Sequence, residues 1–218
     1  MKIKWYGHSA FQITTDKGTR IIIDPYESGS YGGTLSYGKI TDEADIVLTS
    51  HDHPDHNYIK DIQGKYKHIS KAGNYEIHDV KINSLPSFHD NSSGKERGRN
   101  LIFVIATDGL ILVHAGDIGH ALDSELIKKI GKVDILLLPV GGFFTIDALQ
   151  AAKLMNTLQP SITIPMHYKT DKCGFPITPV EEFTKNQNNV RVLKEAEIEI
   201  KKDTLPKKSE IIVLQHDL

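Results

Sequence analysis

Cysteine is nearly absent from this chain of 218 residues. Its single cysteine, Cys173, has no partner for an internal disulfide, and no cysteine pair exists to build a thiolate metal site. This scarcity fits a reducing compartment, with the cytoplasm as the default expectation.

Long apolar runs and an excess of one charge are also missing. No stretch approaches the roughly 20 apolar residues that span a bilayer, and residues 1–13 lack the apolar core of a signal peptide. The 26 Lys and Arg residues against 28 Asp and Glu give a formal net charge of −2. No overall basic field therefore favours nucleic acid or an acidic membrane surface. We expect neither secretion nor membrane insertion, and this charge balance disfavours a nucleic-acid partner.

The composition that remains is that of a globular protein. With 39% hydrophobic and 25% charged residues, the chain can bury a substantial core. No fixed-period repeat and no low-complexity linker divides it. We therefore expect a single domain over residues 1–218.

The first half of the chain is predicted to form short strands joined by turns. The expected strands are 2–6, 10–15, 20–24, 44–50, 66–70, 80–86, 101–108 and 110–117. The turn signals Asp16-Lys17-Gly18 and Asp108-Gly109 predict antiparallel neighbours on either side. Residues 25–39, rich in Gly, Ser and Tyr, predict an irregular loop over one rim of the fold.

The second half alternates helices and strands. We expect helices at 123–130, 145–160 and 178–186, and strands at 133–140, 161–168, 189–195, 196–202 and 210–215. Thr145 is a plausible N-cap of the middle helix, and Pro160 a stop. Because such alternation builds parallel strands covered by helices, the chain is predicted to be an α/β protein with two sheet halves.

A dense group of metal-binding side chains follows the predicted strand 44–50. In the sequence HDHPDH, residues 51–56, His51 and His53 are two apart, so an extended backbone points them the same way. Asp55 and His56 can turn back toward them. The alternative is a polar loop in which Asp55 caps a helix and the histidines are solvated; we favour metal binding.

Further motifs of the same kind lie at or just after other strand ends. They are PSFHD with His89, HAGD with Asp117, IPMHY with His167, WYGHSAF with His8 and IIIDP with Asp24. HDHPDH followed by the first three of these motifs, in this order, resembles the metallo-β-lactamase superfamily, and the His8 and Asp24 motifs look like the N-terminal motifs of one of its branches. That branch contains ascorbate-phosphate-lactonase-like and other uncharacterised hydrolases, and the stretch LLPVGGFFTIDALQAA is similar to it as well. The resemblance implies a four-layer αββα sandwich of two mixed β-sheets flanked by helices.

The resemblance also implies a dinuclear metal site. One metal would be held by His51, His53 and His89, a second by Asp55, His56 and His167, and Asp117 would bridge them. Imidazoles and carboxylates without sulfur suit zinc first, with manganese or iron as alternatives. Oxygen-reducing diiron relatives carry a glutamate where this chain has His53, which favours hydrolysis. A water shared by two metals has its pKa lowered toward about 7, and so supplies hydroxide as a nucleophile.

Supporting roles follow for other residues. Asp55 is a candidate acceptor for the water's proton, and His120 a candidate proton donor to a leaving group. Asp24 is expected to orient a ligand histidine, and His8 has either a supporting role beside the metals or an ordinary buried hydrogen bond. His114 is expected to be structural.

Basic residues follow His89 closely. Lys95, Arg97 and Arg99 lie in the Gly/Ser-rich segment 91–100, where they form either a mobile loop that receives an anionic substrate or a solvated hairpin loop. The aromatic residues of 141–145 and of the loop 25–39 are candidate pocket walls.

The predicted function is metal-dependent hydrolysis of a small ester, lactone or phosphoester. Two alternatives remain open from the sequence. One is a nuclease or phosphodiesterase acting on nucleic acid or cyclic nucleotides, and the other is a metal-binding protein without turnover. Oligomeric state leaves no trace in the sequence.

Overall fold

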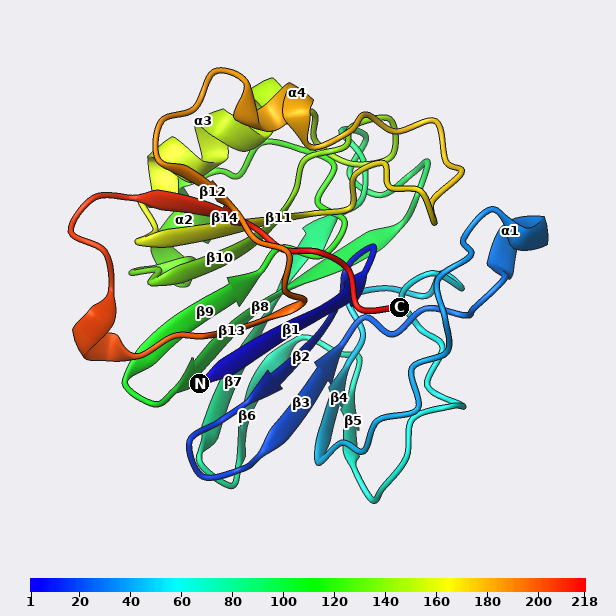
Figure 1. The fold of residues 1–218 in the computed structure, drawn as a ribbon, viewed down its shortest axis with the longest axis vertical. Coiled ribbons are helices and arrows are strands. Elements are labelled where there is room, and N and C mark those ends of the chain that lie inside the picture. The colour runs from blue at the N-terminus through cyan, green and yellow to red at the C-terminus, as the bar shows by residue number, and fades with distance from the viewer.

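A computed structural model describes all residues, 1–218, and contains two mixed β-sheets packed face to face (Figure 1). The first sheet contains β1 (Lys2–Gly7), β2 (Ala10–Thr14), β3 (Arg20–Ile23), β4 (Ile46–Leu48), β5 (Lys67–Ile69) and β13 (Glu197–Glu199). Its order is β13-β1-β2-β3-β4-β5. The β1, β2 and β3 strands pair antiparallel, as predicted, and β3, β4 and β5 pair parallel.

The second sheet contains eight strands. They are β6 (Gly73–Ile77), β7 (Val80–Phe88), β8 (Arg99–Thr107), β9 (Leu110–His114), β10 (Ile135–Pro139), β11 (Ile162–Met166), β12 (Val190–Val192) and β14 (Glu210–Val213). Their order is β12-β14-β11-β10-β9-β8-β7-β6. Antiparallel pairing from β6 to β9 gives way to parallel pairing from β9 to β12, which matches the predicted change between the two halves of the chain.

Alternation along the strands divides the apolar residues between two cores. In β3, Ile21 and Ile23 join the cluster shared by both sheets, whereas Ile22 points outward. Successive strand residues face opposite sides of a sheet, so the outer face of the first sheet also needs a cover. Tyr26 and Tyr37, from the predicted irregular loop, supply much of it.

Helices cover the outer face of the second sheet (Figure 1). They are α2 (Ser124–Ile130), α3 (Ala148–Leu158) and the single turn α4 (Glu181–Thr184). The short α1 (Ser30–Gly33) lies within the loop over the first sheet, and η1 (Lys202–Thr204) is one 3₁₀ turn. The predicted sandwich of two mixed sheets and flanking helices is confirmed, with irregular loop forming most of the layer over the first sheet.

Three local predictions need correction. Thr145 is not the N-cap of α3. The N-cap is Asp147, whose side chain accepts a hydrogen bond from Gln150 N–H, while the Gln150 side chain accepts one from Asp147 N–H, which completes a capping box. The helix expected at 178–186 is only the turn α4. Strand β6 was not predicted, because Gly73 and Asn74 disfavour strand; its pairing with β7 overrides that preference.

No helix in this fold combines the length and the apolar character needed to cross a membrane.

A buried carboxylate links the second sheet to the C-terminal segment. Asp134 is 1% exposed and accepts hydrogen bonds from Ile111 N–H and from Lys202 Nζ. Burial raises the pKa of Asp134, but the Lys202 ammonium and the Ile111 N–H outweigh it, so the pKa lies below its ordinary value of 3.8. The charged form is therefore the one that stabilises the fold.

Asp134→Asn is expected to lower the free energy of unfolding by about 1–2 kcal/mol at pH 7, because a hydrogen bond to a charged acceptor is lost. A lowered folded-state pKa contributes stability above the unfolded pKa, and this is lost as the pH falls through the folded value. The difference between variant and wild type should therefore shrink as the pH falls from 7 to below the ordinary carboxyl pKa of 3.8, as measured by urea denaturation. If the two proteins differed in unfolding free energy by the same amount at pH 7 and at the acid pH, this role of Asp134 would be contradicted.

Candidate metal centre

Strand ends deliver all the predicted ligands to one edge of the sandwich. They are the segment 51–56 after β4, His89 after β7, Asp117 after β9 and His167 after β11, joined by His8 after β1 and Asp24 after β3. The β1, β3 and β4 strands run in one direction, and so do β7, β9 and β11. The carboxyl ends of each set therefore meet, and the side chains converge there.

The converging side chains form three overlapping groups whose ligand atoms lie within 4.8 Å of one another. The first contains His51, His53 and His89; the second contains Asp55, His56, His167 and His8; the third joins Asp117 to His51 and His56. The first two groups contain the ligand sets that the family resemblance implied, with His8 added to the second, and the third contains Asp117, the expected bridging residue.

Asp117 lies at the middle of this arrangement. Its Oδ2 atom is 3.2 Å from His56 Nε2, 3.3 Å from His89 Nε2 and 3.1 Å from His167 Nε2. Asp117 is 1% exposed, and burial raises its pKa. The surrounding histidines, His167 first, outweigh burial and hold the pKa well below its ordinary value, so the carboxylate is charged.

Unpaired polar atoms show that this donor set fits metal ions. His51 Nε2, His56 Nε2 and Asp117 Oδ1 are buried without a hydrogen-bond partner, a costly state unless a cation binds them. Burial lowers the pKa of His51 to about 3, so its imidazole is neutral at pH 7, as metal binding requires.

Asp24 orients two of these histidines from behind. Its Oδ2 accepts a hydrogen bond from His56 Nδ1 at 3.0 Å and another from Ser50 Oγ at 2.7 Å. Since Ser50 Oγ donates to Asp24, it accepts from His51 Nδ1, 2.8 Å away. Hydrogen bonds at Nδ1 thus leave the Nε2 atoms of both rings facing the centre. Burial lowers the pKa of His56, but the Asp117 and Asp55 carboxylates outweigh it and hold the pKa well above its ordinary value, so a cation at this centre must displace the Nε2 proton of His56.

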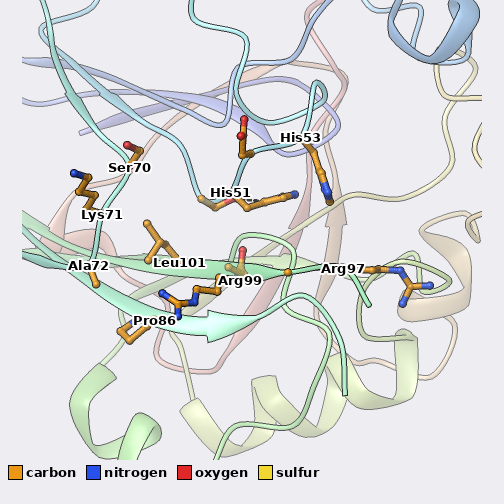
Figure 2. Close-up of a pocket in the computed structure, with 13 residues that line it drawn as sticks. His51, His53, Ser70, Lys71, Ala72, Pro86, Arg97, Arg99 and Leu101 are labelled. Atoms are coloured by element: carbon orange, nitrogen blue, oxygen red, sulfur yellow. Dashed lines mark hydrogen bonds between the residues drawn. The ribbon is translucent and has the colours of Figure 1, made fainter. Parts of the chain in front are cut away.

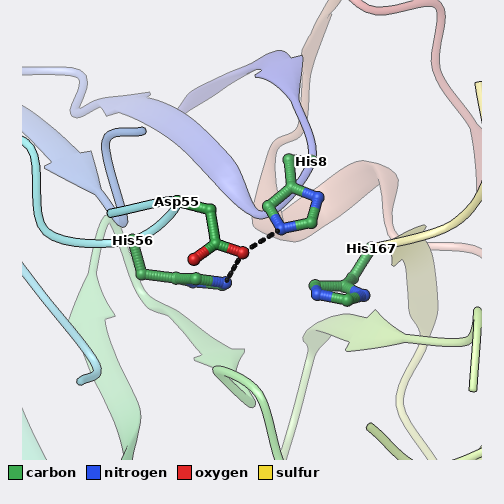
Figure 3. Close-up of side chains that lie close together, drawn as sticks. All are labelled: His8, Asp55, His56 and His167. Carbon is green, nitrogen blue, oxygen red and sulfur yellow. Dashed lines mark hydrogen bonds and ion pairs between the residues drawn. The ribbon is translucent and has the colours of Figure 1, made fainter. Parts of the chain in front are cut away.

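His8 and Tyr31 hold the carboxylate of Asp55. His8 Nε2 donates to Asp55 Oδ2 at 3.1 Å (Figure 3). Tyr31 Oη donates to Asp55 Oδ1 at 3.0 Å. The His8 ring lies 4.1 Å from that of His167, and its backbone oxygen accepts from His167 N–H. Burial raises the pKa of Asp55, but His56 and then His8 bring it well below its ordinary value. A carboxylate of such low basicity is better suited to ligation than to accepting a proton.

Backbone strain is concentrated at the same edge. His8, Asp24 and His167 have φ values of 51°, 48° and 52°, in the left-handed region that non-glycine residues rarely adopt. Each such residue costs about 1–3 kcal/mol and persists only where its surroundings enforce it. The three lie where a strand ends and a side chain turns into the cluster.

Two glycines permit close packing of the ligand-bearing segments. A Cβ atom on Gly119 would lie 2.3 Å from His89 O, and one on Gly141 would lie 2.2 Å from His167 O. Only glycine fits at these contacts. The GDIG and VGGFF stretches therefore serve to bring neighbouring backbone against His89 and His167.

Other histidines lie outside the cluster. His114 donates from Nε2 to Ser9 O and accepts Gly116 N–H at Nδ1, which is a structural role. His120 accepts Phe88 N–H at Nε2 and donates from Nδ1 to Ala121 O. Both nitrogens of His120 are engaged by backbone, so this geometry does not favour the proton donor that the sequence suggested.

The basic segment after His89 has a fixed shape. The carboxylate of Asp90 accepts four backbone N–H groups, from Ser92, Gly94, Glu96 and Arg97. These hydrogen bonds, the one from Arg97 foremost, lower the pKa of Asp90 to about 2. The segment for which the sequence left a mobile loop and a solvated hairpin loop open is therefore wound around a charged carboxylate. Arg97 extends over the Phe144 ring at 5.9 Å.

Aromatic residues line the Asp55 side of the cluster. Phe175 lies 5.2 Å from Tyr31 and 5.5 Å from Phe144, measured between ring centroids. Tyr31 is 48% exposed and Phe143 63% exposed. By contrast Tyr26 and Tyr37, expected to wall the pocket, are buried in the core over the first sheet.

Among the supporting residues that sequence reasoning missed are Asn100 and Asp90. Asn100 is fully buried, and its Oδ1 accepts Asp117 N–H at 2.9 Å while its Nδ2 donates to Ala115 O. No motif signals this contact, because it depends on the β8–β9 pairing. Asp90 had a signal, since an Asp followed by Ser and Gly commonly accepts the N–H groups of a following turn.

Comparisons with known proteins agree with this geometry. Residues 2–167, a range that contains every predicted ligand, match the family described as beta-lactamase superfamily domain. A UPF0173 metal-dependent hydrolase from Thermococcus onnurineus is 34% identical, over 91% of this chain and 98% of its own. Another from Pyrococcus furiosus is 34% identical, over 78% of this chain and 85% of its own.

A solved structure extends the similarity to the fold. A Thermotoga maritima protein, described as a Zn-dependent hydrolase of the metallo-β-lactamase superfamily, has a TM-score of 0.82 and 31% identity, over 98% of this chain and 97% of its own. The chain therefore belongs to the metallo-β-lactamase superfamily, and within it to the UPF0173 metal-dependent hydrolases.

Proposed function

We propose that this metal-dependent hydrolase uses two divalent metal ions to cleave a small ester, lactone or phosphoester. One observation carries the proposal: the Nε2 atoms of His56, His89 and His167 all lie 3.1–3.3 Å from one oxygen of Asp117. Asp117 Oδ1 has no hydrogen-bond partner although it is buried. A carboxylate between two groups of imidazoles suits two cations, because a shared anion offsets their repulsion.

The proposed ligand sets follow the groups described above. His51, His53 and His89 hold the first metal, and Asp55, His56 and His167 hold the second. Asp117 is shared between them. Asp24 and Ser50 fix the orientation of His51 and His56.

Zinc is the metal that we propose first, with manganese or iron as alternatives. The donors are imidazole nitrogens and carboxylate oxygens, which suit all three, and no thiolate is present to select a softer metal. The Zn-dependent description of the Thermotoga maritima relative supports the same choice.

Two divalent ions held by these residues would supply hydroxide as a nucleophile at neutral pH, because a metal-bound water has a pKa of about 7. The chain's own residues would hold the metal ions and orient the ligand side chains. Asp55 is fixed by His8 and Tyr31, and its low basicity favours a ligand role. We do not assign a proton transfer to His120, because backbone groups occupy both its nitrogens.

We further propose a small anionic substrate. Arg97 and Arg99 lie beside His51 and His53 in the same cavity, and the residues that line it leave space for a small molecule. Cations beside a metal site favour substrates that carry negative charge.

Metal analysis with an activity panel tests this function. The panel contains lactones, thioesters, 4-nitrophenyl esters and bis(4-nitrophenyl) phosphate. We expect two metal ions per chain, hydrolysis of at least one class, loss of that activity on chelation and its return with zinc or manganese. Full activity of metal-free protein would contradict the proposal, as would two bound metals without turnover of any class.

A further inference from the structure

A cavity of about 550 Å³ lies beside His51 and His53 (Figure 2). Its other walls come from residues 70–72 after β5, from Pro86 in β7 and from residues 97–101. Small-molecule sites commonly measure roughly 300–1,000 Å³. The cavity is therefore large enough to hold a substituent of the substrate in addition to the group that is hydrolysed.

Three cations line the cavity and are free to bind an anion. Lys71, Arg97 and Arg99 all contribute to its wall, and none of them forms an ion pair or a side-chain hydrogen bond. The one carboxylate of the lining belongs to Asp52, and it accepts a hydrogen bond from Asn57 Nδ2. The cavity is therefore electropositive although the whole chain has a net charge of −2.

The cations lie on two sides of the ligand histidines. In the view of Figure 2, Lys71 and Arg99 lie to one side of His51, and Arg97 lies to the other, beyond His53. Lys71 comes from the segment between the two sheets' edge strands β5 and β6, remote in sequence from the arginines. An anion held between Lys71 and Arg99 leaves the rest of a molecule free to extend toward His51.

We propose that this cavity is a subsite for an anionic group, a carboxylate or a phosphate, that the substrate carries several bonds away from the bond to be cleaved. The inference rests on the proposed function, which assigns His51 and His53 to the first metal. Arg99 supplies a planar pair of donors for two oxygens of the anion, and Lys71 a point charge. The substrate class is thus an ester, lactone or phosphoester with a second, remote oxyanion.

Calorimetric titration of metal-loaded protein tests the subsite without relying on turnover. The probes are adipate and inorganic phosphate, which separate a carboxylate from a phosphate preference. Arg99→Met and Lys71→Met are each expected to weaken binding of the preferred probe about tenfold. Lys95→Met is the matched control, because Lys95 is exposed in the same basic segment but does not line the cavity; its affinity should stay within about twofold of wild type.

Metal content is measured on every variant, so that loss of metal is separated from loss of the subsite. Equal affinities in wild type, Arg99→Met and Lys71→Met, or no binding of either probe, would overturn the inference while leaving the two-metal proposal intact. Failure to bind two metals would instead overturn the proposed function.

A pair of esters gives a second readout. Mono(4-nitrophenyl) adipate and 4-nitrophenyl hexanoate have acyl chains of equal length and differ in a terminal carboxylate. We expect kcat/KM to favour the adipate ester by about tenfold or more, and Arg99→Met to remove that preference. A preference that survives in Arg99→Met, or faster hydrolysis of the hexanoate by wild type, would contradict the subsite.

Discussion

Asp117→Asn is expected to release at least one of two bound metal ions and to lower kcat/KM by at least about a thousandfold. The carboxylate is the only anion that reaches both ligand groups, with three imidazole nitrogens within 3.1–3.3 Å of its Oδ2. A neutral amide cannot offset the repulsion between two divalent ions. The metal content is measured by mass spectrometry, and kcat/KM on the ester that the wild type hydrolyses best.

Asp134→Asn is the matched control for this variant. It also removes a buried carboxylate from the second sheet, and it destabilises the fold, but Asp134 lies away from the metal ligands and binds Lys202. It should keep two metals per chain. An Asp117→Asn protein that retains two metals, or an Asp134→Asn protein that loses them, would show that the metal content does not depend on the bridging position.

Asp24→Asn is expected to weaken metal binding about 10- to 100-fold, although Asp24 touches no metal in the proposed arrangement. Asn tolerates the left-handed φ of 48° at this position, so the backbone should persist. Asp24 accepts Ser50 N–H at Oδ1 and both Ser50 Oγ and His56 Nδ1 at Oδ2. An amide has only one oxygen, and its NH2 group cannot accept a hydrogen bond. One of these two sides therefore loses its acceptor, and the orientation of His51 and His56 is no longer fixed. Competition with a chromophoric zinc chelator measures the affinity.

Asp108→Asn provides the comparison for Asp24→Asn. Asp108 also has a left-handed backbone, with φ of 52°, and its carboxylate accepts a backbone N–H from Asp16, far from the metal ligands. Its substitution should leave the zinc affinity unchanged. Equal affinities of wild type and Asp24→Asn would show that the Asp24–Ser50 contacts do not control the ligand histidines.

Local signals predicted much of the fold. The β8–β9 hairpin follows from Asp108-Gly109, whose φ values of 52° and 70° match the turn that this dipeptide favours. The parallel pairing of β10 with β11 follows from a helix placed between two apolar runs. By contrast β6 lacked such a signal, because only pairing with β7 makes it a strand.

The candidate site divides in the same way. The spacing of HDHPDH predicted a metal site, and the resemblance to the metallo-β-lactamase superfamily implied the full set of seven candidate ligands. The sequence did not reveal that Ser50 Oγ forms hydrogen bonds with both Asp24 and His51 and so links them. Nor did it reveal that Tyr31 donates a hydrogen bond to Asp55. These contacts join segments that approach one another only when the two sheets pack.

The sequence by itself determined the class of the protein, because strand periodicity, turn residues and the HDHPDH motif each act over a few residues. Only the tertiary structure decided which side chains surround the candidate metal centre and which of them are free to bind a substrate. It brought Lys71 and Arg99 to the wall of one cavity, wound the basic segment around the Asp90 carboxylate, and paired both ring nitrogens of His120 with backbone groups. Contacts between distant segments depend on the relative positions of whole sheets and loops, and no local pattern of residues encodes those positions.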